Sequence, residues 1–351
     1  MLYHVLGSDI SQHNQTLLQF FQEDILPNST QKHHFYVVSK QELNYPQLLL
    51  TRFESKKAIA LALITLAKRE PQARFILHGQ YNIWIWFALF CGKLPACRVA
   101  WHVWGADLYE VSSRWKFKLF YPLRRMIQRR LPAIWATKGD LEYVWKHIRA
   151  KRERDRLIYF PSKMPNLQWG YDRKSLEDGE LTILLGNSGD RSNNHLAALS
   201  QLNQYLGHAI KLVIPMGYPA NNESYIREVE QAAKRLFLSE NVQILRSKID
   251  FAEYLHILTA CDLGYFNFER QQGIGTICLL IQQNIPVVLH PNNPFCCDLQ
   301  AEQVPFLMVD NLSQASLCQT REALLQCDKT KIGFFYPNYV KGWLACLETM
   351  L

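Results

Sequence analysis

The sequence predicts an α/β protein with two doubly wound domains, each built on a parallel sheet and facing a cleft between them. Short apolar runs alternate with longer helical patterns along most of the chain, and the alternation fails only around residues 161–180. The 351 residues, 48% of them hydrophobic and 20% charged, suit about two globular domains. Alternating strands and helices favour a parallel sheet that helices cover on both faces.

The first half contains five apolar runs typical of buried strands, with helical patterns between them. We expect strands at 3–6, 35–38, 75–77, 99–103 and 134–136, and helices near 13–26, 55–69, 82–91, 114–130 and 140–149. Pro122 cannot donate a backbone hydrogen bond, so two short helices are expected in place of one at 114–130. Trp84, Trp86 and Phe87 are expected to pack in the core, with a cover over an acceptor groove as the alternative.

The second half repeats this pattern after a stretch at 161–180 that holds two prolines, two glycines and no periodicity, which indicates a linker. The predicted domains are therefore 1–160 and 181–330, followed by a tail at 331–351. We expect strands at 181–185, 210–214, 242–245, 263–266 and 287–289, and helices near 193–206, 222–237, 250–260, 274–284 and 313–327. Ligands of such sheets bind beyond the carboxyl ends of the strands, so the residues that follow each strand are the candidates for function.

Charge is unevenly divided between the two halves. The net charge is +8, but residues 1–160 carry 24 Lys and Arg against 12 Asp and Glu, whereas the remainder carries 15 against 19. A basic half joined to a mildly acidic half suggests that the first domain faces an anionic surface. The longest apolar run, 83–91, has nine residues, and a membrane span needs about 20.

A polar, glycine-bearing turn follows the strand expected at 181–185. Its candidate ligand-binding residues are Gly186, Asn187, Ser188, Gly189 and Arg191. The glycines allow close approach of the backbone to a ligand, and an arginine can pair with a phosphate through two hydrogen bonds. A well-capped turn between strand and helix is the alternative interpretation.

A second turn of this kind follows the strand expected at 263–266. Arg270 precedes a helix start whose unpaired N–H groups can bind an anion; this start comprises Gly273, Ile274, Gly275 and Thr276. No G-x-G-x-x-G follows the first strand, which argues against a dinucleotide fingerprint. The two turns together predict a diphosphate site in the second domain. Tyr218, in a Pro-Met-Gly-Tyr-Pro turn, is a candidate for stacking on a base or sugar, or else for packing in a rigid turn.

Acid–base candidates follow the strands of the first domain. Asp9, His102 and Asp107 lie just after or at predicted strand ends, where each could act as a general base toward a hydroxyl or serve a structural role. The chain has no Asp-x-Asp, the pair that often holds a metal-bound diphosphate. We therefore expect helix starts and arginines, with no metal, to meet the charge of a leaving group.

The segment 114–130 combines seven basic residues with four aromatic ones and contains no acidic residue. The candidates for contact with an anionic bilayer are Arg114, Trp115, Lys116, Lys118, Arg124, Arg125, Arg129 and Arg130. Each basic residue near such a surface contributes about 1 kcal/mol. An ordinary solvated helix and a nucleic-acid-binding surface are the alternatives.

Several long motifs, in order along the chain, resemble one known family. They are HVLGSDI at 4–10, HGQ at 78–80, WHVWGADLYE at 101–110, KLFYPLRR at 118–125, ATKGDL at 136–141, GNSGDRSN at 186–193, PMGYPANNE at 215–223, CDLGYFNFERQQGIGT at 261–276 and FYPNY at 335–339. The chain resembles the bacterial TDP-N-acetylfucosamine:lipid II N-acetylfucosaminyltransferases, the 4-α-L-fucosyltransferase family of enterobacterial common antigen synthesis.

This resemblance implies a glycosyltransferase of the GT-B arrangement with the donor nucleotide in the second domain and the acceptor facing the first. The implied donor is TDP-4-acetamido-4,6-dideoxy-galactose, and the implied acceptor is an undecaprenyl-diphosphate disaccharide at the cytoplasmic face of the inner membrane. Glu269 or Gln272 would bind the sugar, thymidine would lie near Tyr218 and 246–249, and 331–351 would pack as a helix on the first domain. Two other functions stay open from the residues: a nucleotide-sugar isomerase of the same fold and a nucleic-acid binder.

Overall fold

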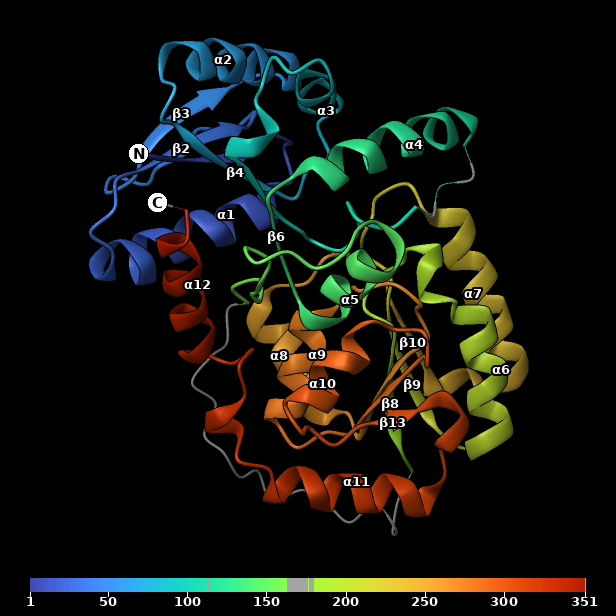
Figure 1. Ribbon diagram of the computed structural model, residues 1–351. Helices are drawn as coiled ribbons and strands as arrows, with labels where there is room; N and C mark the ends of the chain where they lie inside the picture. Colours follow the sequence, from blue (N-terminus) through green and yellow to red (C-terminus); the bar gives the residue numbers. More distant parts are fainter. Residues whose placement is uncertain (111, 113, 163–175, 177–179, 351) are drawn as a thin grey trace. The chain divides into compact units, whose positions relative to one another are not determined.

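The computed structural model describes residues 1–110, 112, 114–162, 176 and 180–350, so most of the expected linker at 161–180 lies outside the described residues. The chain forms two compact units: Met1–Lys163 together with Tyr336–Leu351, and Met164–Phe335. Each unit contains one all-parallel sheet with helices on both faces (Figure 1). The predicted fold class is thereby confirmed at the level of two parallel α/β domains.

The sheet of the first unit has seven strands in the order β3-β2-β1-β4-β5-β6-β7. Their bounds are β1 Leu2–Leu6, β2 His33–Val38, β3 Leu49–Phe53, β4 Arg74–His78, β5 Val99–His102, β6 Ala133–Ala136 and β7 Arg156–Leu157. The sequence analysis missed β3 and β7, which are the edge strands. Edge strands bury less of their surface: β3 has no buried residue and passes from two leucines to Thr51 and Arg52, and β7 has only two residues.

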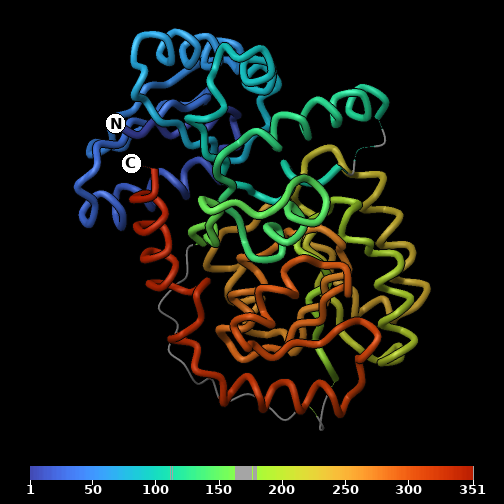
Figure 2. The backbone as a smooth tube through the Cα atoms, in the orientation of Figure 1, coloured from blue at the N-terminus to red at the C-terminus, as the bar shows by residue number. Residues whose placement is uncertain are grey.

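The helices of the first unit are α1 Ser11–Phe20, α2 Lys56–Arg69, α3 Ile83–Phe90, α4 Trp115–Arg130, α5 Lys138–His147 and α12 Asn338–Glu348. The chain continues from α1 in helical form through Phe21–Ile25 and Leu26–Asn28. In Figure 2 the red C-terminal helix α12 runs beside the blue first helix. Trp343 of α12 packs on Phe20 and Phe21 at ring distances of 5.7 and 5.5 Å, which fixes α12 to this unit.

Helix α4 continues through Pro122, so the expectation of two short helices is wrong. A proline inside a helix removes one hydrogen bond and crowds the preceding turn. Buried side chains on both sides of it hold α4 against the unit; they are Tyr121, Arg124, Ile127 and Gln128. Their spacing of three or four residues makes one continuous inward stripe, which outweighs the local cost of the proline.

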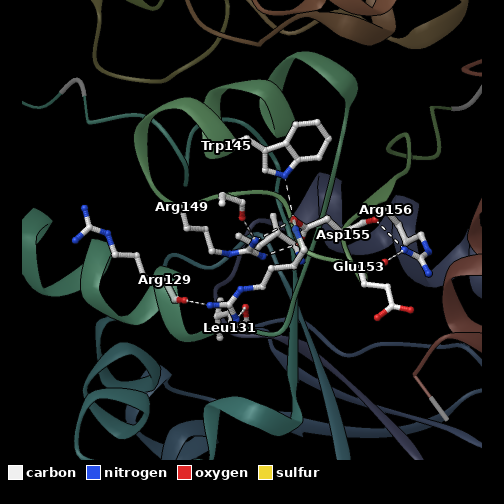
Figure 3. A network of polar contacts seen from close by, with 10 residues as sticks. Arg129, Leu131, Trp145, Arg149, Glu153, Asp155 and Arg156 are labelled. Atoms are coloured by element: carbon white, nitrogen blue, oxygen red, sulfur yellow. Dashed lines mark hydrogen bonds and ion pairs between the residues drawn. The ribbon is translucent and has the colours of Figure 1, made fainter.

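A buried carboxylate joins α5 and β7 to β6 in the first unit (Figure 3). Asp155 accepts hydrogen bonds from Trp145 Nε1 at 3.0 Å and from the Ile134 N–H at 3.0 Å, and Arg149 Nη2 lies 2.6 Å from its Oδ1. The side chains of Arg149 and Asp155 are almost fully buried. Part of the basic excess of the first half therefore stabilises the fold and does not face solvent.

The second unit has a six-stranded sheet in the order β10-β9-β8-β11-β12-β13. Its strands are β8 Thr182–Leu185, β9 Lys211–Pro215, β10 Val242–Leu245, β11 Leu263–Phe266, β12 Val287–Leu289 and β13 Leu307–Met308, and its helices are α6 His195–Leu206, α7 Glu223–Leu236, α8 Phe251–Ala260, α9 Ile274–Gln282, α10 Phe295–Ala301 and α11 Gln314–Gln326. The sequence analysis missed the short β13 and α10. Helices α6 and α7 cover one face of this sheet, and α8, α9 and α10 cover the other (Figure 1).

Candidate functional site

The two glycine-bearing turns of the second unit lie against each other, because β8 and β11 are neighbouring parallel strands. Asn194 Nδ2 donates to the Asn267 carbonyl at 2.9 Å, and Ser192 Oγ donates to Gln272 Oε1 at 2.8 Å. A Cβ on Gly273, whose φ is +65°, would lie 2.9 Å from Asn187 Cγ. The two turns therefore form one continuous polar loop pair at the carboxyl edge of the sheet.

Arg270 is held inside this loop pair. Its Nη2 donates to Ser192 Oγ at 3.1 Å and lies 3.6 Å from Asp190 Oδ1. Its Nε is buried and has no hydrogen-bond partner among the described residues. The guanidinium thus keeps a donor that no described residue uses.

The start of α9 lies next to the same loop pair. Gly273 is the N-cap, in a left-handed conformation, and no side chain caps the helix. The first hydrogen bond of the helix runs from the Ile277 N–H to the Gly273 carbonyl at 3.0 Å, so the N–H groups of 274–276 precede the intrahelical ladder. These donors and the helix dipole make a place for an anion beside Arg270.

The other donor-site candidates take different positions in the second unit. Gly186, with a φ of +72°, begins the first turn, and the Ser188 hydroxyl accepts from Asn193 Nδ2 at 3.1 Å. The Gly189 N–H donates to the Tyr218 carbonyl at 2.6 Å, so the turn after β9 adjoins the loop pair, and the Tyr218 ring itself is exposed. Glu269 is exposed and lies 3.8 Å from His290 Nε2.

Arg191 does not point into the loop pair. Its Nη2 pairs with Glu228 on α7 at 2.9 Å, and its guanidinium lies over the Tyr225 ring, 4.3 Å from the centroid. This exposed pair is weak, but it directs the side chain toward α7. The structure thus brings together the glycines, Asn187, Arg270 and Gln272 and leaves Arg191 outside.

His195 is a residue of this loop pair that the sequence analysis missed. Its Nδ1 lies 3.1 Å from the Tyr225 hydroxyl, while its Nε2 is buried without a hydrogen-bond partner among the described residues. A Cβ on Gly186 would lie 2.9 Å from that Nε2. Burial lowers the pKa of His195 to about 4, against an opposing effect of Asp190, so the ring is neutral. The sequence offered one signal, a histidine directly after the glycine-bearing turn.

Asp107 of the first unit has a structural role. Its carboxylate accepts three hydrogen bonds at 2.8 Å, from the Gln80 N–H, the Trp104 N–H and Trp101 Nε1. Burial raises its pKa, although these donors oppose the rise. A buried carboxylate that accepts from three donors ties the loop after β4 to the loop after β5. The expectation of Asp107 as a general base is therefore not supported.

His102 and Asp9 contrast with each other in exposure. His102, the last residue of β5, is buried, and burial lowers its pKa well below the usual value, with a further effect of His78. Asp9 is exposed; it accepts from Ser11 Oγ at 3.2 Å and from the Lys40 N–H at 3.4 Å. Of the three acid–base candidates, Asp9 alone combines exposure with weakly engaged carboxylate oxygens.

An aromatic cluster that the sequence analysis missed lies at this edge of the first unit. The Trp104 ring is 5.3 Å from His13 and 5.4 Å from Phe160, and the Phe160 ring stacks on His102 at 6.3 Å. A Cβ on Gly79 would lie 2.2 Å from the Trp104 ring, so glycine is required beneath it. Such aromatic faces are suited to the apolar face of a sugar ring.

Helix α4 carries most of the predicted basic surface, with one correction. Arg124 is buried, and its Nη1 and Nη2 donate to the carbonyls of Asp107 and Leu108 at 3.0 and 2.8 Å. It cannot contact a bilayer. Arg125 is exposed but pairs with Glu110. The other predicted membrane-binding residues are exposed: Arg114, Trp115, Lys116, Lys118, Arg129 and Arg130.

Exposed apolar side chains accompany these charges on α3 and α4. Trp115 and Leu119 of α4 are 66% and 71% exposed, and Trp84 and Phe87 of α3 are 47% and 42% exposed. The core position expected for Trp84 and Phe87 is therefore wrong, whereas Trp86 is buried as expected. Helix α3 is apolar all round and has more apolar surface than its inward face can bury. We call the large exposed apolar residues of these two helices, together with the exposed basic residues of α4 and its N-cap that pair with no acidic side chain among the described residues, the α3–α4 surface; they are Ile83, Trp84, Phe87, Phe90, Arg114, Trp115, Lys116, Phe117, Lys118, Leu119, Met126, Arg129 and Arg130.

In the described ranges, no three His, Cys, Asp or Glu side chains group closely enough to hold a metal ion. No helix in the described part of the chain has the length and apolar character needed to cross a bilayer.

The chain is similar to solved glycosyltransferases along its whole length. A glycosyltransferase from Rickettsia africae ESF-5 matches with a TM-score of 0.65 at 12% identity, covering 99% of this chain and 98% of that one. The α,α-trehalose 6-phosphate synthase of Burkholderia multivorans matches with a TM-score of 0.65 at 12% identity, covering 99% and 98%. Sucrose-phosphate synthase from Thermosynechococcus elongatus gives 0.63 at 13% identity, covering 99% and 96%. At these identities the likeness shows the fold, which is that of GT-B glycosyltransferases.

A family model gives the more specific result. Residues 1–350 match the model described as 4-alpha-L-fucosyltransferase, glycosyl transferase group 56. The match spans both units, so it includes the loop pair of the second unit and the carboxyl edge of the first. It favours glycosyl transfer over the isomerase and the nucleic-acid binder that the residues alone left open. The chain therefore belongs to the 4-α-L-fucosyltransferase family and is a glycosyltransferase.

Proposed function

We propose that the protein transfers 4-acetamido-4,6-dideoxy-galactose from its TDP-linked form to an undecaprenyl-diphosphate-linked disaccharide, lipid II of enterobacterial common antigen synthesis. The observation that carries the donor half of this proposal is the position of Arg270, with a buried unused Nε, beside the uncapped start of α9. A diphosphate needs this combination of a fixed positive charge and several backbone N–H donors. Family membership supports glycosyl transfer, and the sugar and the acceptor are those that the sequence motifs imply by resemblance.

Catalysis at the donor would consist mainly of stabilising the departing diphosphate. Negative charge grows on the bridging oxygen as the glycosidic bond breaks, and preorganised donors stabilise it at little reorganisation cost. Arg270 and the N–H groups of 274–276 are placed to do this, with Asn187 and Gln272 next to them. We propose that transfer needs no metal ion. EDTA should leave the rate unchanged, and a strict requirement for Mg²⁺ would contradict this part.

The acceptor is proposed to bind at the carboxyl edge of the first sheet. Trp104 and Phe160 offer faces for a sugar ring, and Asp9 lies on the neighbouring loop after β1. In a transfer that inverts configuration, the attacking hydroxyl must lose a proton as the new bond forms. Asp9 is then the side chain to receive it, since Asp107 is committed to three backbone and indole donors.

The α3–α4 surface is proposed to rest on the cytoplasmic face of the bacterial inner membrane, where a lipid-linked acceptor is found. Its basic side chains complement anionic lipid headgroups, and its exposed aromatic side chains suit the interface between headgroups and acyl chains. The disaccharide of such an acceptor lies near the bilayer, so attachment would keep enzyme and substrate within reach of each other.

A nucleotide-binding measurement tests the donor assignment first. In a thermal-shift titration, TDP should raise the melting temperature at lower concentration than UDP or GDP. The transfer itself is tested by incubating TDP-4-acetamido-4,6-dideoxy-galactose with the lipid-linked disaccharide and detecting a lipid-linked trisaccharide. Preference for another base, or transfer to a soluble sugar only, would contradict the donor or the acceptor respectively.

A further inference from the structure

Four buried histidines form an unbroken row of hydrogen bonds across the sheet of the first unit. They lie on the adjacent strands β2, β1, β4 and β5 and are, in that order, His33, His4, His78 and His102. His33 Nδ1 lies 2.9 Å from His4 Nε2, His4 Nδ1 lies 3.0 Å from His78 Nε2, and His78 Nδ1 lies 3.0 Å from His102 Nδ1. We call these four residues the histidine row.

All four rings are neutral. Burial lowers the pKa of His78 to about 3 and that of His33 to about 4, and it holds His4 and His102 well below their usual value. The other titratable groups that act on the row are its own members and the N-terminal amino group, which further lowers the pKa of His33. Aromatic rings also pack on the row: Phe21 and Phe35 on His4, and Trp343, Trp104 and Phe160 on His102.

The Trp104 end of the row sets the direction of its hydrogen bonds. A neutral imidazole has one N–H donor and one acceptor nitrogen, so one fixed ring determines the next. At one end Trp104 Nε1, which can only donate, lies 3.2 Å from His102 Nδ1. At the other end Ser29 Oγ accepts from the Gln31 N–H at 3.2 Å and lies 3.1 Å from His33 Nε2; because its hydroxyl can donate to that nitrogen or accept from it, this end fits either direction.

The Trp104 donor favours a single arrangement, which the Ser29 hydroxyl can satisfy. Ser29 donates to His33, His33 Nδ1–H donates to His4, His4 Nδ1–H donates to His78, and His78 Nδ1–H donates to His102 Nδ1. The lone pair of His102 Nδ1 is then occupied by His78 and Trp104, and its proton is on Nε2. The reverse arrangement would set an N–H of His102 against the N–H of Trp104.

We propose that the histidine row holds His102 in the Nε2–H tautomer, so that His102 donates a hydrogen bond to a carbohydrate oxygen of the bound substrate. His4, His33 and His78 are positioning residues in this account, and His102 is not the general base. The substrate part rests on the proposed glycosyl transfer; the tautomer part does not. The donated proton stays on the ring throughout, so the step makes and breaks no covalent bond.

The tautomers can be measured in the ligand-free protein. The chain has 11 histidines, and long-range ¹H–¹⁵N correlation spectra of ¹⁵N-histidine-labelled protein separate the two neutral tautomers from the charged ring. We expect Nδ1–H for His4, His33 and His78 and Nε2–H for His102, with no change between about pH 5.5 and pH 8 because none of the four titrates there. A charged ring in the row, or a proton on Nδ1 of His102, would overturn the proposal.

Two substitutions at one position separate donation from proton removal. The amide of Gln reaches the place of Nε2 and can donate there, whereas the shorter Asn reaches only the place of Nδ1. His102→Gln should therefore keep kcat/KM for the acceptor within about tenfold of wild type, and His102→Asn should lose about a hundredfold, the cost of one donor in a preorganised site. Equal losses in both variants would overturn the substrate part.

His34 provides the matched control. It is the next residue on β2, bonds Thr51 Oγ1 at 2.8 Å and lies outside the row. His34→Gln should leave both the kinetics and the His102 spectrum unchanged. If the wild-type protein transfers no sugar to any acceptor, the proposed function fails, while the spectra still decide the tautomer of His102.

Discussion

Nη2 of Arg270 lies 3.1 Å from the hydroxyl oxygen of Ser192, which joins the turn after β11 to the turn after β8. The two residues are 78 positions apart in the sequence. They meet because β8 and β11 are adjacent in the sheet, although β9 and β10 come between them along the chain. This contact holds the two separate glycine-bearing turns together as one loop pair.

Arg270→Ala should lower kcat strongly and affect lipid binding little. The substitution removes the one guanidinium that is held inside the loop pair, and loss of such a donor at a developing negative charge costs about 10²–10³ in rate. The measurement is steady-state transfer together with sedimentation on liposomes. Arg191→Ala is the matched control, because Arg191 pairs with Glu228 on α7 and should cost less than about tenfold. Similar losses of kcat in both variants would contradict the proposed role of Arg270 in stabilising the departing diphosphate.

Gly273→Ala should weaken TDP binding, whereas a glycine substitution that strains the backbone away from the loop pair should not. Gly273 has a φ of +65°, so alanine there costs about 1–2 kcal/mol of backbone strain. Its Cβ would also lie 2.9 Å from Asn187 Cγ and push the two turns apart. Gly207→Ala serves as control: its φ is +76°, but no atom lies within 4 Å of the added Cβ. Both variants should unfold more easily, and titration calorimetry should show weaker TDP binding only for Gly273→Ala.

The main strands and helices could be predicted from sequence because buried parallel strands form clear apolar runs. The pairing of the two turns followed only from the sheet order, which no local pattern contains. Arg191 and Arg124 show the limit most directly. Each is an arginine in a basic or polar stretch. The Arg191 side chain turns toward α7, whereas Arg124 lies on the buried face of α4 and donates to two backbone carbonyls. Side-chain direction depends on neighbours that are distant in sequence.

Asp155→Asn should destabilise the first unit in a pH-dependent way. Burial alone would raise the pKa of Asp155, but hydrogen bonds from Arg149, Arg152 and Trp145 outweigh it, and the pKa is lowered. A lowered pKa in the folded state means that the carboxylate stabilises the protein above its unfolded pKa of about 3.9 and loses that effect as the pH falls below it.

Urea unfolding at pH 7 should therefore give a free energy of unfolding about 3 kcal/mol lower for Asp155→Asn, as expected when one partner of a buried pair is removed. The difference from wild type should shrink toward pH 3. Glu54→Gln, which breaks the exposed Arg52–Glu54 pair at 4.0 Å, should change stability by less than about 1 kcal/mol at any pH. A pH-independent loss in Asp155→Asn would show that the carboxylate charge is not what stabilises this junction.

Membrane attachment should depend on the exposed basic residues of the α3–α4 surface and not on every arginine of α4. Replacing Arg114, Lys116, Lys118 and Arg130 with Ser removes four charges near the lipid, each contributing about 1 kcal/mol. Sedimentation with vesicles of anionic phospholipid should fall sharply in this variant, and the remaining binding should weaken further with salt.

The apolar part of the same surface makes a separate contribution. Trp84→Ser with Phe87→Ser removes two exposed aromatic side chains of α3 without touching the buried Trp86. This double variant should bind vesicles more weakly at high salt, where the charge contribution is screened and the insertion of apolar side chains dominates.

Arg124→Ser is not a suitable test of lipid binding. It leaves the Asp107 and Leu108 carbonyls without their donors, so it should lower the melting temperature whether or not α4 contacts lipid. Equal sedimentation of the quadruple variant and wild type at low salt would refute the charge contribution, because these four residues are, with Arg129, the exposed basic side chains of 114–130 that pair with no acidic side chain among the described residues.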